Sequence, residues 1–284
     1  MLIQEKIPLS SYSTIEIGGP ANFLIEASTK EELTSAYLWG SRKELPIFVV
    51  GRGSNTLFSD LGFSGLVIVN RYTQIEETSP GLFHVGSGTP LPLLSMKTAS
   101  HGWSGLEWGL GIPGSVGGAI VMNAGASQSD ISVPLKAVLF LHPDGTEEWI
   151  EKENIQFSYR KSPFQEKKGA ILEATFALTL DREARGRQLA QFNHRRKTQP
   201  YHEPSLGCVF KNHEGHSCGQ MIDELGLKGT KSGGAHISPL HGNFITNPGG
   251  GKAEDVLKLM DLVEKRVKEV KNLDLEREIR VVRY

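Results

Sequence analysis

The sequence predicts a fold that combines strands and helices, of the α+β or α/β class. Two observations carry this prediction. Across residues 23–69, short apolar runs of strand length alternate with a helical pattern, and near the end of the chain a long helical pattern precedes an extended run. At roughly 100–200 residues per domain, 284 residues are enough for two domains or for three small ones.

The first predicted elements lie before residue 70. Apolar runs predict strands over residues 23–27, 47–50 and 66–69. Between the first two strands, Thr29 is followed three residues later by Glu32, which is the spacing of a capping box. We therefore expect a helix to begin at this point.

The middle of the chain predicts a β-hairpin and a long strand. Two runs, over residues 137–141 and 147–150, flank the turn signal Pro143-Asp144-Gly145. Residues 170–180 are predicted as one continuous strand. The charged and turn-rich residues that follow predict a domain boundary near residues 185–204.

The last third predicts two helices, over residues 219–225 and 253–270, and a terminal strand over residues 275–282. Apolar residues of the longer helix recur at helical spacing and are expected to face the core; they are Val256, Leu259, Met260, Val263 and Val267. Alternation along the terminal strand is expected to place Glu276, Glu278 and Arg280 on one face, and Leu275, Arg277, Ile279 and Val281 on the other.

Charge and hydropathy argue against several classes of protein. Lys and Arg total 31 and Asp and Glu total 32, whereas nucleic-acid binders usually carry a basic excess. No apolar run approaches the roughly 18 residues of a membrane span, and the N-terminus lacks the basic start and apolar core of a signal peptide. The two cysteines, Cys208 and Cys218, are too few for a disulfide framework and fit a reducing compartment. We expect a cytoplasmic monomer that binds neither nucleic acid nor membrane.

Glycine is over-represented, at 32 of 284 residues, against an average near 7%. Residues 109–114 satisfy G-x-G-x-x-G, but Pro113 and the residues before the motif argue against a dinucleotide-binding fingerprint. Residues 249–253 resemble a phosphate loop, yet the first glycine and the Ser/Thr after Lys252 are missing. This second segment is predicted to be a loop that enters a helix.

Two further glycine segments predict backbone close to a ligand. Residues 51–55 directly follow a predicted strand, where backbone N–H groups can converge on an anion, although a tight turn explains the same pattern. Residues 112–119, followed by residues 123–126, are too rich in glycine for a strand and too apolar for a solvated loop. Backbone packed against a flat ligand explains both properties.

A zinc site is an alternative near the C-terminal third. Cys208, His213, His216 and Cys218 provide two thiols and two imidazoles, which can satisfy tetrahedral zinc. Their spacing is not that of a standard zinc site, because the two-residue gap between paired cysteines is absent. A buried cysteine that packs as a small apolar side chain is a further alternative for Cys208.

Eight segments together resemble the UDP-N-acetylenolpyruvoylglucosamine reductase family, MurB. In order they are residues 14–21, 51–65, 105–125, 157–164, 204–212, 226–229, 241–244 and 275–278. The resemblance covers nearly the whole chain. The short segment between Phe176 and Arg195 resembles the family's shorter type, which lacks an extra substrate-covering tyrosine loop.

The resemblance implies an α+β fold like that of vanillyl-alcohol oxidase. Two FAD-binding lobes would span residues 1–72 and 73–184, and a C-terminal α+β substrate-binding domain would span residues 190–284. The implied reaction begins with reduction of non-covalently held FAD by NADPH. A hydride then passes to the enol ether of enolpyruvyl-UDP-N-acetylglucosamine, a UDP-sugar, to give UDP-N-acetylmuramate for peptidoglycan synthesis.

The resemblance also assigns binding residues. FAD would be held by Gly51, Gly53, Ser54, Asn55, Thr56, Leu57, Gly111, Ile112, Pro113, Gly114, Gly117, Gly118, Asn123, Ala124 and Gly125. The nucleotide sugar or its phosphates would contact Lys211 and Asn212.

Three residues are expected to carry the chemistry. Hydride addition leaves negative charge on the enolpyruvyl carboxylate, and Arg160, in the family's catalytic-arginine motif, suits a carboxylate, although most arginines are solvated. Cys208 stands where the family usually has serine and is the expected proton donor, because a thiol is a stronger acid than an alcohol yet mostly protonated at pH 7. Alignment with the family motif selects Glu278 over Glu276 as the third residue.

Two other functions stay open. An oxidase of the same fold would act on a small alcohol with oxygen as acceptor. A non-catalytic nucleotide-sugar binder or a zinc-stabilised module would use the C-terminal residues without redox chemistry.

Overall fold

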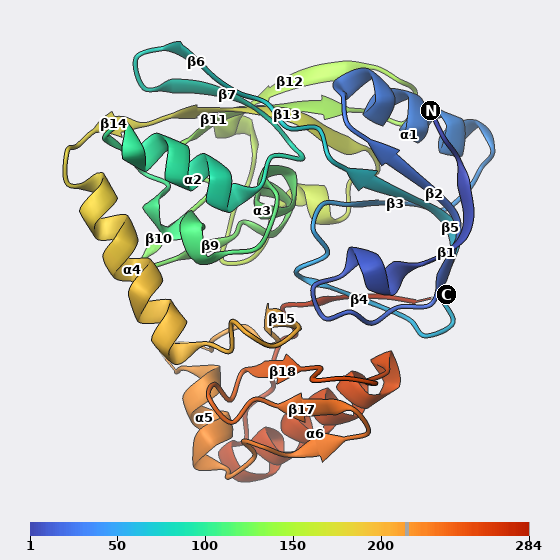
Figure 1. Ribbon diagram of the computed structural model, residues 1–284, viewed down its shortest axis with the longest axis vertical. Coiled ribbons are helices and arrows are strands. Elements are labelled where there is room, and N and C mark those ends of the chain that lie inside the picture. Colours follow the sequence, from blue (N-terminus) through green and yellow to red (C-terminus); the bar gives the residue numbers. More distant parts are fainter. Residues whose placement is uncertain (214–215, 284) are drawn as a thin grey trace. The chain divides into compact units, whose positions relative to one another are not determined.

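The strands expected near the N-terminus lie in a four-stranded sheet with the order β1-β2-β5-β3 (Figure 1). Strands β3 and β5 run parallel, and Ile47 is paired with Leu66. The predictions for residues 23–27, 47–50 and 66–69 are confirmed. The bounds are β1 (Gln4–Pro8), β2 (Pro20–Ala27), β3 (Ile47–Val50) and β5 (Phe63–Asn70).

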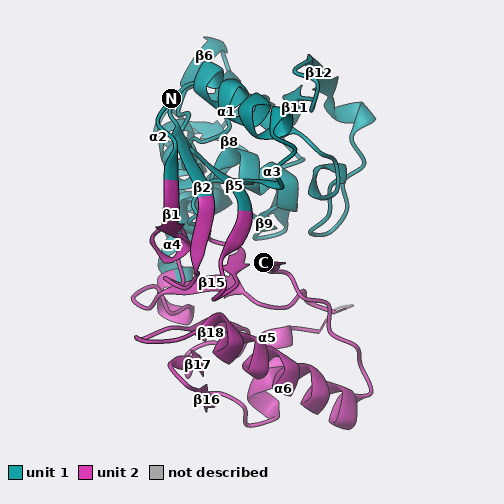
Figure 2. Cartoon of the chain, turned by 90° about the vertical axis from the view of Figure 1, so that its right-hand side faces the viewer, with its two compact units in different colours: residues 1–4, 23–52, 65–195 teal, residues 5–22, 53–64, 196–284 magenta. Residues whose placement is uncertain are grey.

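The computed structural model describes residues 1–213 and 216–283 of the chain. These divide into two units (Figure 2). Unit 1 comprises residues 1–4, 23–52 and 65–195, and unit 2 comprises residues 5–22, 53–64 and 196–284. Strands β1, β2 and β5 therefore contribute residues to both units.

Helix α1 (Lys30–Arg42) begins at the predicted capping box. The Thr29 hydroxyl accepts a hydrogen bond from the backbone N–H of Glu32 at 3.2 Å, and the Glu32 carboxylate accepts one from Ser28 N–H at 2.7 Å. The first bond satisfies an N–H group that the first helical turn leaves without a partner, and the second fixes the residue before the cap. The inner face of α1 packs into an apolar cluster of unit 1 with strand residues such as Ile68 and Leu172.

A five-stranded sheet with the order β12-β11-β13-β7-β6 forms the rest of the unit 1 framework. Its hairpin β11/β12 confirms the prediction around Pro143-Asp144-Gly145. The strands are β6 (Ile75–Ser79), β7 (Leu82–Gly86), β11 (Leu135–Leu141), β12 (Glu147–Glu151) and β13 (Ala170–Ala177).

The single strand expected over residues 170–180 is wrong, because the strand breaks at Leu178. The N–H of Leu178 still donates to Gly81 O at 2.7 Å, in register with the β13/β7 pairing, and its side chain is buried, but the chain then changes its partner strand. Thr179–Leu180 then forms a separate strand, β14, which pairs with β8 (Trp103–Ser104).

Three helices of unit 1 lie within or next to the glycine-rich residues 105–125. They are α2 (Leu91–Ser100), the 3₁₀ helix η2 (Glu107–Gly111) and α3 (Val116–Met122). The sequence did not predict α3, since glycine disfavours helices and α3 contains Gly117 and Gly118. After α3, a two-stranded ribbon joins β9 (Gly125–Ala126) to β10 (Ser129–Asp130).

Helix α4 (Ala184–Thr198) occupies most of the segment where a boundary was expected. Its sequence is polar, and Ala184 and Gln188 are its buried residues. Polar contacts join its first residues to other parts of unit 1: Arg187 bonds to Glu107 and Asp181 at 2.8 Å each, and Gln188 donates to Ser95 O at 2.7 Å. Unit 1 ends at Arg195, so the last three residues of α4 belong to unit 2.

Unit 2 contains a second four-stranded sheet with the order β15-β18-β17-β16, together with α5 (Cys218–Glu224) and α6 (Ala253–Lys271). Both helix predictions are confirmed. The strands are β15 (Ser205–Cys208), β16 (Lys231–Ser232), β17 (Ala235–Ile237) and β18 (Phe244–Thr246).

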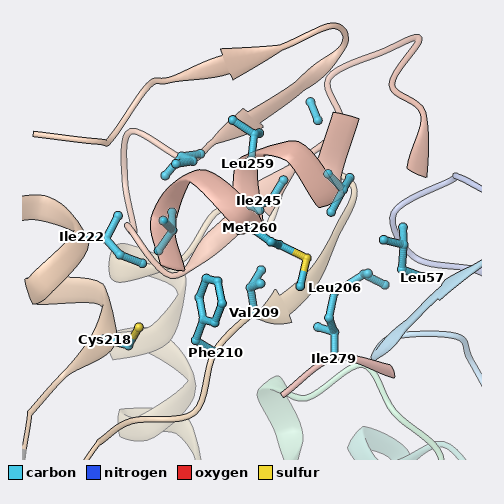
Figure 3. Close-up of a cluster of buried hydrophobic side chains, with 14 of the residues drawn as sticks. Leu57, Leu206, Val209, Phe210, Cys218, Ile222, Ile245, Leu259, Met260 and Ile279 are labelled. Carbon is cyan, nitrogen blue, oxygen red and sulfur yellow. The ribbon is translucent and has the colours of Figure 1, made fainter. Parts of the chain in front are cut away.

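The apolar face of α6 packs into the unit 2 core, as its spacing predicts (Figure 3). At its start, the Asp60 carboxylate accepts bonds from the N–H groups of Ala253 and Glu254, at 2.8 and 3.1 Å. The glycine-rich loop before Lys252 enters this helix, as expected.

The terminal strand is shorter than expected: β19 covers Arg280–Val282 and pairs in parallel with β4 (Thr56–Phe58). A bend at Ile279 separates it from residues 276–278. The single alternation over residues 275–282 is therefore wrong, and Ile279 and Val282 are the buried apolar residues rather than Ile279 and Val281. In the part of the chain that the structure describes, no helix is long and apolar enough to cross a membrane.

Candidate functional site

The loop after β3 packs directly on the start of α3 in unit 1. A Cβ at Gly51 would lie 2.0 Å from Ser115 Oγ, so only glycine fits there. Ser115 caps α3, its hydroxyl accepting from Gly118 N–H at 3.3 Å. Gly117 lies against Ser87, to whose carbonyl its N–H donates at 2.8 Å. The glycines thus bring three loops of unit 1 together.

Parts of the main chain between Gly111 and Gly118 are also accessible to solvent. Gly111, Ile112 and Gly114 are half-buried, and Pro113 and Gly118 are exposed. A Cβ built at Gly118 would meet one atom within 4 Å, Ser115 Oγ at 3.3 Å. The segment therefore presents bare main chain at its surface, which is what close approach of a flat ligand requires.

Asn123 ends α3 in a left-handed conformation, with φ of 41°, and is 2% exposed. Its amide nitrogen donates to Ser158 O at 2.9 Å. Its Oδ1 is buried and has no hydrogen-bond partner among the residues that the structure describes. A buried acceptor without a donor costs free energy, so this oxygen fits a ligand that offers an N–H or O–H group.

Arg160 is fixed against the same loop. It lies in a tight turn closed by two backbone bonds between Ser158 and Lys161, at 3.1 and 2.9 Å. Its Nη2 donates to Gly125 O at 2.8 Å, and its guanidinium lies 5.0 Å from the ring centre of Tyr159. The structure thus brings together Arg160, Asn123 and Gly125, with Ala124 between the last two.

The other residues that the resemblance assigns to FAD, Gly53 to Leu57, belong to unit 2. Gly53 has φ of 63°, and a Cβ there would lie 2.1 Å from Tyr12 O. The Ser13 hydroxyl lies 3.3 Å from Gly53 O and 3.1 Å from Thr56 O, which fixes the loop containing Ser54. Thr56 and Leu57 are buried, and Leu57 belongs to the unit 2 core (Figure 3).

Asn55 connects this loop to the terminal segment that carries Glu278. Its Nδ2 donates to Glu278 O at 3.1 Å, and its carbonyl accepts from Arg280 N–H at 2.9 Å. On the other side, Glu278 N–H donates to Val209 O at 2.7 Å, next to Cys208. Glu278, Asn55 and the chain around Cys208 are therefore brought together within unit 2.

Cys208 is half-buried at the end of β15, where it pairs with Phe244 of β18. Gly207 before it has φ of 76°, a conformation that favours glycine. Asn243 holds the next residues: its Oδ1 accepts from Phe210 N–H at 2.9 Å and its Nδ2 donates to Phe210 O at 2.8 Å. Sequence reasoning gave Asn243 no role, although it lies in one of the resembling segments.

Asn212 and Lys211, the two residues expected to contact a nucleotide sugar, differ in exposure and in bonding partner. Asn212 is exposed, and its side-chain oxygen accepts from Cys218 N–H at 3.0 Å, at the start of α5. Lys211 is 8% exposed, and its ammonium bonds Glu276 Oε1 at 2.6 Å. Nothing in the sequence around Lys211 indicated this pair, because Glu276 lies 65 residues away.

The residues of the zinc alternative do not form a metal site. Cys218 is fully buried in the unit 2 core (Figure 3), and this burial raises the pKa of its thiol to about 12. Across residues 1–213 and 216–283, no group of three or more His, Cys, Asp or Glu side chains is arranged to hold a metal ion.

Comparison with known proteins gives full-length matches. The model of the UDP-N-acetylenolpyruvoylglucosamine reductase C-terminal domain matches residues 199–282, and an FAD binding domain model matches residues 21–151. UDP-N-acetylenolpyruvoylglucosamine reductase of Protochlamydia amoebophila is 46% identical over 276 residues, which cover 97% of this chain and 92% of the relative. The protein of that name from Chlamydia trachomatis serovar D is 42% identical, covering 99% and 97%. The crystal structure of MurB from Thermus caldophilus has a TM-score of 0.85 at 39% identity, covering 99% of each chain.

Proposed function

The chain belongs to the UDP-N-acetylenolpyruvoylglucosamine reductase family, and from that premise we propose that it reduces enolpyruvyl-UDP-N-acetylglucosamine to UDP-N-acetylmuramate, using FAD and NADPH. The expected family, the α+β fold class and the assignment as a flavin-dependent oxidoreductase are confirmed by the full-length matches. The observation that carries the proposed reaction is the placement of Arg160 against the glycine-rich loop at Gly125.

The residues of unit 1 fit an FAD molecule. The exposed backbone at Gly118 gives a flat ligand close access, and the unpartnered Asn123 Oδ1 can accept from an N–H or O–H of the flavin or its ribityl chain. We propose that these residues hold FAD together with Gly51, Gly111–Gly114 and the loop from Gly53 to Thr56. When bound, FAD supplies the hydride that adds to the terminal methylene carbon of the enol ether.

Arg160 is proposed to stabilise the charge that this addition creates. Negative charge spreads into the enolpyruvyl carboxylate, and a guanidinium binds a carboxylate through two parallel N–H donors while remaining charged at every working pH. Its bond to Gly125 and its contact with Tyr159 restrict the guanidinium before substrate arrives. Preorganised charge of this kind requires no rearrangement during the reaction.

Cys208 and Glu278 are proposed to complete the reaction. The carbon next to the methylene must receive a proton, and the half-buried Cys208 thiol is the proposed donor. Glu278 is proposed to act on the same developing enolate, since its backbone is bonded next to Cys208, at Val209.

Asn212 is the proposed contact to the nucleotide sugar, because its side chain is exposed beside the start of α5. Lys211 is a different case. Its ammonium is buried against Glu276, so that a direct contact with a phosphate would require this ion pair to open.

The proposal extends to organisation and location. We propose FAD-binding lobes over residues 1–72 and 73–184 and a substrate-binding domain over residues 190–284, supported by the two family models at residues 21–151 and 199–282. Both cysteines are outside disulfides, which supports a reducing, cytoplasmic location. A monomer is proposed as the working unit.

The absorption spectrum of the purified protein tests the cofactor part of this proposal. We expect flavin bands, with FAD released into solution when the protein is denatured, because no covalent link is proposed. Apoprotein prepared by removing FAD should regain the bands when FAD is added. A colourless protein that binds no added FAD would contradict the proposal and favour a non-catalytic sugar-nucleotide binder.

A further inference from the structure

Residues 276–278 run antiparallel to residues 209–211 in unit 2, but the pairing is short. One isolated bridge joins Phe210 to Arg277. It is flanked by two backbone bonds, from Lys211 N–H to Glu276 O at 2.8 Å and from Glu278 N–H to Val209 O at 2.7 Å. Bends at Val209 and Ile279 end the pairing on the side of Glu278.

So short a pairing specifies its own register weakly. A shift by one residue along an extended strand turns every side chain to the opposite face. Such a shift here would replace Glu278 by Arg277, which exchanges a carboxylate for a guanidinium at the same place. The pairing of β19 with β4, which begins at Arg280, and a contact at the other end of the segment are therefore needed to hold Glu278 in place.

The Lys211–Glu276 pair supplies this interaction. The two residues stand opposite each other in the pairing, and Lys211 Nζ bonds Glu276 Oε1 at 2.6 Å. The Lys211 side chain is 9% exposed and that of Glu276 is 57% exposed, so one end of the pair is fixed inside the protein. A buried ammonium that loses its acceptor is strongly unfavourable, so a shifted register is disfavoured.

Asn55 holds the same segment from its other end, through its bonds to Glu278 O and Arg280 N–H. We infer that Lys211 is a positioning residue, which acts on the reaction through Glu276 by locking the register that presents Glu278, rather than by binding a substrate phosphate. This inference rests on the proposed function. It assigns Glu276 to the ion pair with Lys211 and leaves the proposed reaction to Glu278.

A double-mutant cycle tests this inference. Lys211→Met and Glu276→Ala should each slow oxidation of the reduced flavin by the enol ether about tenfold or more, because small displacements of a reacting group are costly. The double variant should be about as slow as either single variant, since both remove one shared interaction. The KM for the UDP-sugar and the rate of flavin reduction by NADPH should change less than twofold, and Lys211→Arg should recover most of the rate.

A second ion pair of unit 2 provides the control. Lys271 bonds Glu224 at 2.6 Å on the exposed side of α6, and Lys271→Met should leave both half-reactions unchanged. A phosphate contact by Lys211 would instead raise the KM in Lys211→Met alone, leave Glu276→Ala near wild type and make the double variant additive. That result would overturn the inference. Wild-type enzyme that fails to reduce the enol ether at all would overturn the proposed function instead.

Discussion

Arg160 has a backbone conformation that non-glycine residues seldom adopt, with φ of 55°. The turn bonds between Ser158 and Lys161, and the bond from Gln165 to Arg160 O at 3.0 Å, hold it there. Left-handed residues of this kind cost free energy and persist where the surrounding structure fixes them, often at functional sites. The strained turn is therefore consistent with a guanidinium that must be placed accurately.

Cys208 carries the prediction that most depends on a single side chain. General acid catalysis is typically worth about 100- to 10,000-fold, so Cys208→Ala should slow reduction of the enol ether by that order. NADPH oxidation at the flavin should hardly change. Cys208→Ser should keep much more activity, because it restores the family's usual proton donor. Single-turnover stopped-flow measurements of each half-reaction provide the test.

Peroxide provides an independent check on the same thiol. The wild-type enzyme should lose activity in peroxide, and should recover it with a thiol reductant if oxidation stops at the sulfenic stage. The Cys208→Ser variant should resist inactivation by peroxide. Cys218 should not contribute, because its burial raises its thiol pKa to about 12 and leaves little thiolate at neutral pH. If Cys208→Ala matches the parent in single turnover, Cys208 serves only packing.

Several polar residues of the motifs have structural roles that their sequence pattern could not reveal. Asp60 caps α6, Asn55 bonds to Glu278 O, and Lys211 pairs with Glu276. Each partner lies more than 60 residues away in sequence. A single sequence shows that such a residue is polar, but contains no signal for a partner at that separation. Ligand contact and structural bonding therefore look alike until the fold is known.

At the scale of elements, α4 depends on polar contacts rather than on an apolar face. Arg187 connects it to Glu107, which is 8% exposed at the start of the glycine-rich segment. Burial alone would raise the pKa of Glu107, but bonds from backbone N–H groups, Arg187 and Ser104 outweigh it and hold the pKa below its usual range. The ionised carboxylate therefore stabilises the folded state.

Replacing Glu107 by Gln should lower the free energy of unfolding by about 2 kcal/mol at pH 7, since hydrogen bonds to a charged group are lost. A lowered pKa in the folded state gives stability that is fully present above the unfolded-state pKa and is lost as pH falls through the folded-state pKa. The difference between wild type and Glu107→Gln should therefore shrink in acid. Urea unfolding at a series of pH values measures it.

An exposed ion pair provides the matched control for this prediction. Glu254 pairs with Lys258 on the surface of α6, and Glu254→Gln should change stability by less than about 0.5 kcal/mol at any of these pH values. Equal effects of the two substitutions at pH 7 would mean that the Glu107 network contributes no more than a surface pair.

Whether the sequence predicts an element depends on what stabilises that element. Helix α6 and the β11/β12 hairpin are visible in the sequence, because apolar spacing and turn residues determine them locally. Helix α3 is not, since glycine disfavours helices and Gly117 packs against Ser87 of another segment. Helix α4 is not, because polar bonds from Arg187 and Gln188, and not an apolar face, hold it in place. The break at Leu178 and the bend at Ile279 occur where the chain changes its pairing partner, from β7 to β8 and from Phe210 to β4.

For the whole molecule, the residues assigned to one reaction come from both units. Unit 1 carries Arg160 and most of the glycine-rich residues, and unit 2 carries Cys208, Glu278 and the loop after Gly53. The chain and its relatives match over almost their full lengths, with 97% of this chain and 92% of the Protochlamydia protein aligned. The residues proposed for the activity are accordingly distributed along the given sequence and over both units.

Anaerobic single turnover of the enol ether is the most direct test of this activity. Enzyme reduced with one equivalent of NADPH is mixed with enolpyruvyl-UDP-N-acetylglucosamine, and flavin absorbance is followed while the product is identified by mass. We predict that the oxidised flavin bands return with one UDP-N-acetylmuramate formed per flavin, and that Arg160→Ala slows this step about 100-fold while NADPH still reduces the flavin normally. Flavin that stays reduced until oxygen is admitted, with no product formed, would contradict the account.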